Sequence, residues 1–166
     1  MLLVGAVLFL AGCKYESPLT QEHTIPVDSS LLGLWEIVPD GKEEPRNRER
    51  MMVLKYSDTE YLIHYPIEEG GMYFRGYSIK IGDVSCVQLQ LIGTGNGPLD
   101  KDQKALFHVA SYQLVNGELE IKTLNTDLVD GDLKDAEALK SAFLKYRDNQ
   151  ELFTNPGRFK RMKGKS

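Results

Sequence analysis

Apolar and polar residues alternate through most of the chain after residue 30, which predicts a β-rich domain. Within 84–92, for example, Val87, Leu89 and Leu91 alternate with Gln88 and Gln90, so one side of this strand is expected to be packed and the other to face solvent. Gly76 predicts a bulge or bend in a long strand. Strands are expected at 34–38, 51–56, 61–65, 72–81, 84–92, 105–114 and 119–124, with short extended pieces at 151–154 and 158–162.

The spacing of apolar residues changes once from a strand-like to a helical period, between residues 132 and 148. Ala136, Leu139, Phe143 and Tyr146 recur there at helical spacing, and either Asp132 or Asp135 is expected to cap the helix. Successive strands with short turns and one late helix predict a mainly β fold. We expect a small antiparallel barrel or a strongly curved sheet, with the C-terminal helix packed on its outside or end.

The first thirteen residues show a different pattern, an apolar run followed by small residues. Residues 1–10 form an apolar run that is shorter than the roughly 20 residues of a membrane-spanning helix and fits a secretory signal. The run ends in Leu10-Ala11-Gly12-Cys13, which resembles the lipobox of bacterial lipoproteins. That resemblance implies a signal peptide at 1–12 and acyl chains, such as palmitate, on Cys13. No Lys or Arg precedes the run, which is atypical of such a signal. The alternative is an ordinary signal peptide or a buried N-terminal strand.

Residues 13–30 are polar, include two prolines and show no periodicity, so a lipidated cysteine followed by a flexible tether is expected. The globular domain is expected at 31–162 and a basic tail at 163–166. In enteric lipoproteins Asp after the cysteine favours the inner membrane, and here Lys14 follows Cys13. The lipobox resemblance therefore implies a lipid-anchored protein of the outer membrane that faces the periplasm.

A second resemblance concerns Gly33 and Trp35, which are similar to the Gly-x-Trp that opens the first strand of lipocalins. It implies a lipocalin-like barrel in which Trp35 closes one end. A basic side chain near the C terminus would pack on the ring, with Arg158, Lys160 and Arg161 as candidates. The whole layout also resembles uncharacterised envelope lipoproteins.

Aromatic residues in the first half of the predicted sheet are candidates for lining a pocket. Tyr61, Tyr65, Tyr73 and Tyr77 would supply rings for a small apolar ligand. The alternative is that they are core residues and cross-strand pairs.

No pattern in the sequence predicts catalysis, a metal or a cofactor. His23, His64 and His108 lack metal-ligand spacing. The glycine-rich 93–97 is not followed by a phosphate-binding helix, and the aspartates at 127–132 fail the calcium-loop pattern. Cys86 is expected to be a buried apolar residue, with a reactive thiol or a dimer bridge as the alternative.

Charge and composition narrow the class of partner. The net charge is −4, and because Arg158, Lys160, Arg161, Lys163 and Lys165 lie together, the rest of the chain is more acidic still. This argues against nucleic acid. We therefore expect an envelope-anchored, non-catalytic module that binds a small apolar ligand or an envelope component. A scaffold or inhibitor lipoprotein is the alternative, and an enzyme is the least expected class.

Overall fold

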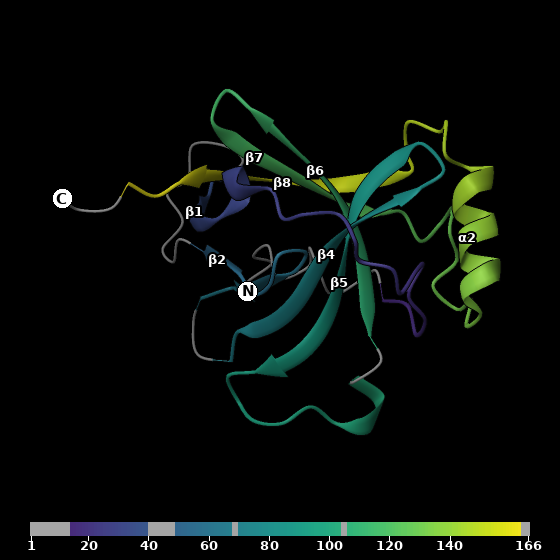
Figure 1. Ribbon diagram of the computed structural model, residues 1–166, viewed down its shortest axis with the longest axis horizontal. Helices are drawn as coiled ribbons and strands as arrows, with labels where there is room; N and C mark the ends of the chain where they lie inside the picture. Colours follow the sequence, from purple (N-terminus) through teal and green to yellow (C-terminus); the bar gives the residue numbers. More distant parts are fainter. Residues whose placement is uncertain (1–13, 40–48, 68–69, 104–105, 164–166) are drawn as a thin grey trace, which may run out of the picture.

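The computed structural model describes residues 14–39, 49–67, 70–103 and 106–163. Over these residues the chain forms eight antiparallel strands, one α-helix and two short 3-10 helices (Figure 1). In chain order they are η1 (Ser29–Leu31), β1 (Gly33–Ile37), β2 (Arg50–Lys55), β3 (Tyr61–Tyr65), β4 (Met72–Ile81), β5 (Val84–Thr94), η2 (Lys101–Gln103), β6 (Phe107–Val115), β7 (Glu118–Leu124), α2 (Ala136–Lys145) and β8 (Phe153–Arg161).

The strands form one sheet that curves into a ring. Each strand pairs with the next along the chain, and β8 pairs with β1, where Trp35 lies opposite Arg161. The expected mainly β fold with antiparallel strands and one late helix is confirmed. The predicted strands agree with the structure to within a few residues. The two expected extended pieces near the C terminus form one strand, and the helix is shorter than the predicted 132–148.

The inner face of the ring carries the first of two hydrophobic cores, here called the inner core. The alternation in β5 predicted its packed side correctly, because Val87, Leu89 and Leu91 all belong to this core. The buried members are Leu31, Trp35, Met51, Val53, Tyr61, Tyr65, Phe74, Val87, Leu89, Leu91, Leu99, Leu119 and Phe159.

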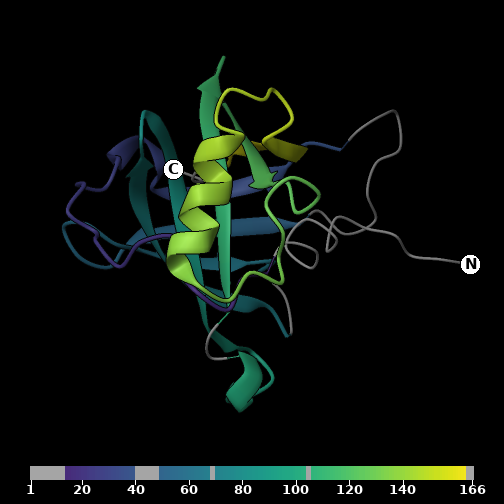
Figure 2. The same ribbon diagram turned by 90° about the vertical axis from the view of Figure 1, so that its right-hand side faces the viewer.

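The outer core lies between the outside of the ring and α2, which covers this side of the sheet (Figure 2). Asp135 caps the helix, since its side chain accepts a hydrogen bond from the Ala138 N–H at 2.9 Å. The apolar stripe of α2 then presents Leu139 and Phe143 to the sheet, and both are buried. The long hairpin β4–β5 reaches this core with Ile79 and Ile81.

The segment expected to be a flexible tether instead packs on the outside of the ring. Tyr15 is 1% exposed and forms an antiparallel bridge with Phe107 at the start of β6. Leu19 is also buried, and further along, the Val27 N–H donates to the Asp58 carbonyl at 2.9 Å. Residues 14–30 are thus part of the domain, while Cys13 lies outside the described residues.

Two further local expectations are wrong. Gln88 does not face solvent and is completely buried, because the N-terminal segment covers it. The irregularity of β4 lies between Tyr73 and Phe74 and not at Gly76. Gly76 serves close packing, since a Cβ there would lie 2.9 Å from Leu89 Cδ2.

Among the described residues, no helix combines the length and the apolar character that a bilayer-spanning helix needs.

Candidate functional site

The inside of the ring holds a cavity of about 80 Å³ whose lining is entirely apolar in character. Seven of the eight strands and η1 contribute to it. Ala110 on β6 is its smallest lining residue and lies opposite Val87 of β5, which also lines the cavity. The lining residues are Leu31, Met51, Val53, Tyr61, Ile63, Tyr65, Phe74, Val87, Leu89, Ala110, Tyr112, Leu119, Ile121 and Phe159.

The strand alternation sorts the candidate tyrosines into two sets. Tyr61 and Tyr65 line the cavity, and both hydroxyls are held at its margin. The Tyr61 oxygen accepts from the Asp28 N–H at 2.6 Å, and the Tyr65 hydroxyl donates to Glu49 Oε2 at 2.6 Å. Tyr112 also lines the cavity, and burial raises the pKa of its hydroxyl. The rings therefore face the cavity while the polar atoms stay outside its apolar lining.

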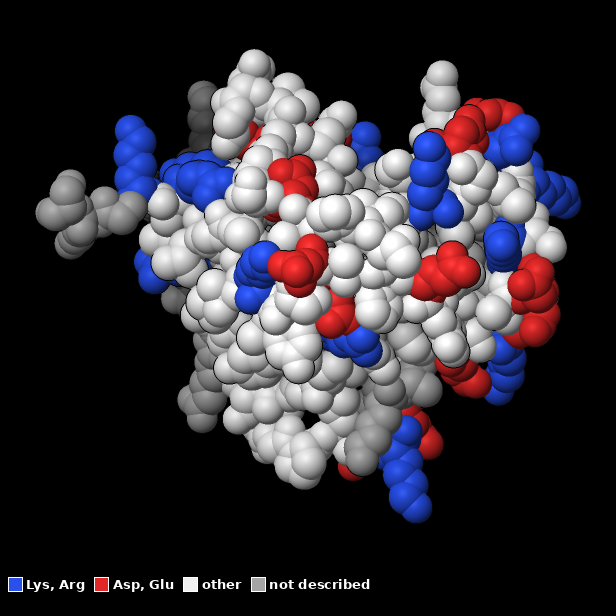
Figure 3. Space-filling model, viewed as in Figure 1, with Lys and Arg blue, Asp and Glu red and all other residues white. Residues whose placement is uncertain are grey.

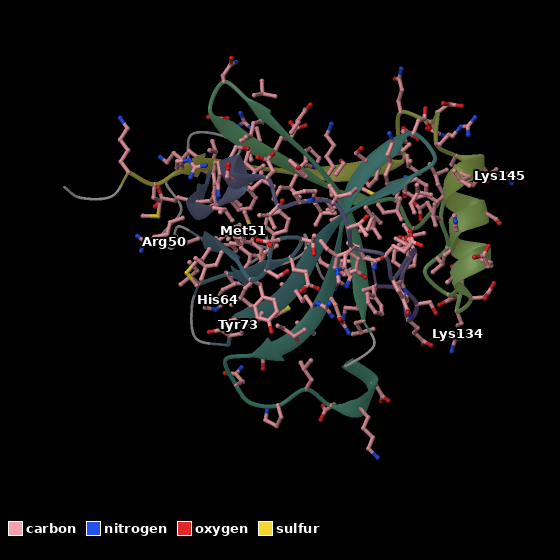
Figure 4. The ribbon with its side chains drawn as sticks, viewed as in Figure 1. Arg50, Met51, His64, Tyr73, Lys134 and Lys145 are labelled. Carbon is pink, nitrogen blue, oxygen red and sulfur yellow. The ribbon has the colours of Figure 1, made fainter. Side chains whose placement is uncertain are left out.

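Tyr73 and Tyr77 do not line the cavity, so this part of the sequence prediction is wrong. Both side chains point out of the ring. Tyr73 stacks on His64 with 4.1 Å between ring centroids, and Figure 4 shows the two side chains next to each other. Tyr77 belongs to the outer core. The four tyrosines share a strand-like spacing, but β3 and β4 present opposite faces at these positions.

Trp35 is 1% exposed, and Arg161 is the basic residue that lies on its ring, with 4.4 Å between the guanidinium carbon and the ring centroid. The indole N–H donates to the Leu31 carbonyl at 2.9 Å, which joins Trp35 to η1. Arg161 also donates to the carbonyls of Leu32 and Ser30. Gly33 makes this approach possible, because its φ is +132° and a Cβ would lie 2.7 Å from Arg161 Nη1.

The other two basic candidates lie elsewhere. Arg158 pairs with Glu118 on β7, with 3.5 Å between Nη1 and Oε2. Lys160 lies 3.6 Å from Glu36, a carboxylate that is only 6% exposed and that also faces Arg50. Of the three candidates, Arg161 therefore has the expected position on the Trp35 ring.

A polar cluster on the outside of the ring is not predicted by the sequence pattern. Glu60 is 6% exposed and accepts a hydrogen bond from Arg75 Nε at 2.6 Å. His23 from the N-terminal segment completes the cluster, with its Nε2 3.8 Å from Glu60 Oε1 and its ring 5.2 Å from that of Tyr77. These contacts join residues far apart in sequence, so no local motif could reveal them.

The same segment is held further by Gln88. Its side-chain oxygen accepts from the Leu19 N–H at 2.6 Å, and its amide nitrogen donates to the Thr20 carbonyl at 2.9 Å. The Tyr77 hydroxyl donates to the same carbonyl at 3.1 Å. Gln88 and Tyr77 thus replace the solvent that the backbone at 19–20 would otherwise bind.

The cysteine and the two strand histidines, which were the other candidates for chemistry, pack against neighbouring side chains. Cys86 is 2% exposed in the outer core, and burial raises the pKa of its thiol to about 12, which agrees with an inert apolar residue. Burial lowers the pKa of His64. His108 packs inside the ring against the edge of Phe74, at 5.7 Å between ring centroids. No group of three or more His, Cys, Asp or Glu residues in the described ranges could hold a metal ion.

Part of the outer wall, at β1 and β2, is left uncovered by the described residues. Leu34 and Leu54 are 44% and 42% exposed there. Met52 lies beside Leu34 and His64 in the strand register. Charged side chains gather around α2, on the right of Figure 3, whereas the lower part of that face has few.

The chain matches no protein-family model, no curated protein and no solved structure.

Proposed function

We propose that this protein is an envelope lipoprotein, anchored through Cys13, whose domain binds a small apolar molecule inside the ring of strands. The observation that carries the proposal is the cavity of about 80 Å³ with its apolar lining. An apolar cavity of about 150 Å³ stays free of water and binds benzene. A cavity half that size suits a slim group, such as a short alkyl or acyl chain, better than a fused ring system.

The proposal includes a lipocalin-like barrel with Trp35 closing one end. The stacking of Arg161 on Trp35 and the bond from the indole to η1 support it. A ligand would then enter at the other end of the ring. The proposed role is non-catalytic, without a cofactor or nucleic acid, and the placement is the periplasmic side of the outer membrane.

A protein partner is the second candidate, and the uncovered outer wall favours it. Leu34 and Leu54 are large apolar side chains exposed on neighbouring strands of that wall. Exposed apolar residues in one patch mark interaction surfaces. If the protein were a scaffold or inhibitor, charged substitutions at Leu34 and Leu54 would abolish cross-linking to its partner and leave the cavity unaffected.

The cavity can be tested with linear alcohols from butanol to decanol, measured by calorimetry on the purified domain. Burying each further methylene is worth about 0.8 kcal/mol, so affinity should rise roughly fourfold per methylene until the cavity is full. Ala110→Leu, which places three more carbons in the cavity, should shorten the longest chain accepted. Leu119→Ala should lengthen it.

Ser111→Leu is the matched control, because Ser111 neighbours Ala110 on β6 but is not among the lining residues. It should leave the series unchanged. Native mass spectrometry of the protein from its own cell envelope should then show an apolar molecule that Ala110→Leu loses. Alcohol affinities that do not depend on chain length, or that fall equally in Ala110→Leu and Ser111→Leu, would refute the proposal.

A further inference from the structure

The N-terminal segment determines how far the domain can stand from a lipid attached to Cys13. The first docked residue is Tyr15, whose backbone exchanges hydrogen bonds with Phe107 at 2.9 and 2.8 Å and whose hydroxyl donates to the Val129 carbonyl at 2.9 Å. Only Lys14 separates Tyr15 from Cys13. Two extended residues span roughly 7 Å, against about 50 Å for a free tether through residue 30.

The docking is distributed along the segment and so does not depend on Tyr15 alone. Leu19 is buried and bonded to Gln88. His23 contacts the Glu60–Arg75 pair, and the Asp28 N–H donates a hydrogen bond to the Tyr61 oxygen. Contacts spread over fourteen residues prevent the segment from lengthening by partial release at its end, because each release exposes a buried group.

From these contacts we infer that the acylated protein lies directly against the bilayer in one fixed orientation. This inference rests on the proposed lipid anchor. The membrane-facing side is the surface around Tyr15, here called the anchor-side surface, made of Lys14, Glu16 and the connection from Asp130 to Lys134. Ser17 Oγ donates to the Lys134 carbonyl at 2.5 Å, Lys134 Nζ lies 3.3 Å from Glu16, and the Lys14 carbonyl lies against Gly131.

The opposite end of the molecule then points into the periplasm. In Figure 1 the beginning of the N-terminal segment (purple) lies near α2 on the right, whereas β1 and the turn between β6 and β7 lie on the left. Figure 4 places Lys134 next to one end of α2, on the same side as this beginning. Trp35, Arg161 and the basic end of β8 belong to the side that faces away from the bilayer.

The lipid on Cys13 holds the anchor-side surface at the bilayer, and electrostatic attraction to the headgroups does not. Asp130 and Asp132 are exposed there together with Glu16, against Lys14 and Lys134. Such a mixture with an acidic excess has no attraction to anionic headgroups. Unacylated protein with Cys13→Ser should therefore not float with vesicles that contain anionic lipid.

The orientation can be measured on acylated protein in phospholipid vesicles whose headgroups carry a spin-label quencher. One fluorophore is placed at Asp132→Cys, on the anchor-side surface, and in a second sample at Val115→Cys, beside the β6–β7 turn, where Val115 is 48% exposed. Cys86 stays unlabelled because it is buried and its pKa is raised to about 12. We expect quenching at Asp132→Cys to exceed that at Val115→Cys severalfold.

The decisive variant inserts twelve Gly and Ser residues between Lys14 and Tyr15, which leaves the docking contacts from Tyr15 onward intact and adds a linker of roughly 20 Å. Quenching at Asp132→Cys should then fall to the level at Val115→Cys. Equal quenching at the two positions without the insertion, or quenching at Asp132→Cys that the insertion does not change, would overturn the inference. Failure of the wild-type protein to float, with no acyl mass on Cys13, would instead overturn the anchor, and the orientation with it.

Discussion

Arg161 combines three contacts that are individually modest. Its guanidinium stacks on the Trp35 ring and donates to two carbonyls next to η1, those of Ser30 and Leu32. A stacked cation contributes about 0.5–1 kcal/mol at an exposed site, and a net hydrogen bond contributes about as much. Together they hold η1, β1 and β8 at one end of the ring, where Gly33 leaves the space for the side chain.

We therefore expect Arg161→Ala to lower the free energy of unfolding by about 1.5–3 kcal/mol, and to shift the Trp35 emission to longer wavelength as water reaches the ring. Arg158→Ala is the matched control, since Arg158 lies on the same strand and pairs with Glu118 at the surface. Surface pairs contribute at most about 1 kcal/mol. Urea unfolding followed by fluorescence measures both variants, and equal losses would contradict the special place of Arg161.

At the scale of elements, the residues before η1 form part of the folded domain. The segment from Tyr15 to Asp28 lies across β6, β5, β4 and β3 in turn, through hydrogen bonds with Phe107, Gln88, Tyr77 and Tyr61. Gln88 is the central contact because it satisfies both a backbone donor and a backbone acceptor of the segment. A buried amide of this kind is costly to remove, since its partners stay buried.

Gln88→Ala should therefore lower the free energy of unfolding by about 1–3 kcal/mol. It should also raise amide hydrogen exchange at residues 15–23 far more than elsewhere. Gln90→Ala, two residues along the same strand on the same side of the sheet, is the matched control and should change neither quantity much, because Gln90 is only partly buried. Unchanged exchange at 15–23 in Gln88→Ala would mean that other contacts alone hold the segment.

These elements also show what the sequence could predict. The alternation in β5 and the spacing of Leu139 and Phe143 identify the packed faces, because burial on one face leaves a periodic pattern. The pattern cannot say which core a face enters, so it predicts Tyr77 at the cavity although Tyr77 lies in the outer core. Gln88 has the polarity of an exposed residue and is buried by a segment with no periodicity of its own.

On the scale of the whole molecule, one sheet lies between two hydrophobic cores and contributes side chains to both. In β5 the inward residue Val87 belongs to the inner core and its neighbour Cys86 to the outer one. Strands β4, β5 and β6 contribute to both cores, so loss of packing on one side should remove the support of the other. The domain should therefore unfold in a single transition in spite of its two hydrophobic clusters.

Two native residues report on the cores separately. Trp35, the only tryptophan, lies in the inner core, and Cys86 is the buried thiol of the outer core. Native Cys86 should resist thiol reagents at pH 8, because its pKa is raised to about 12, and should react once the outer core opens. We expect Trp35 emission and pulsed labelling of Cys86 to give the same urea midpoint.

Phe143→Ala tests the coupling, because the ring is completely buried between α2 and the sheet and belongs to the outer core, whereas Trp35 belongs to the inner core. Its loss should destabilise the domain by about 3–5 kcal/mol and lower both midpoints together. Ser141→Ala, at an exposed position of the same helix, should lower neither. If Phe143→Ala lowered the Cys86 midpoint and left the Trp35 midpoint in place, the ring of strands would be stable without α2, and the two cores would be separate folding units.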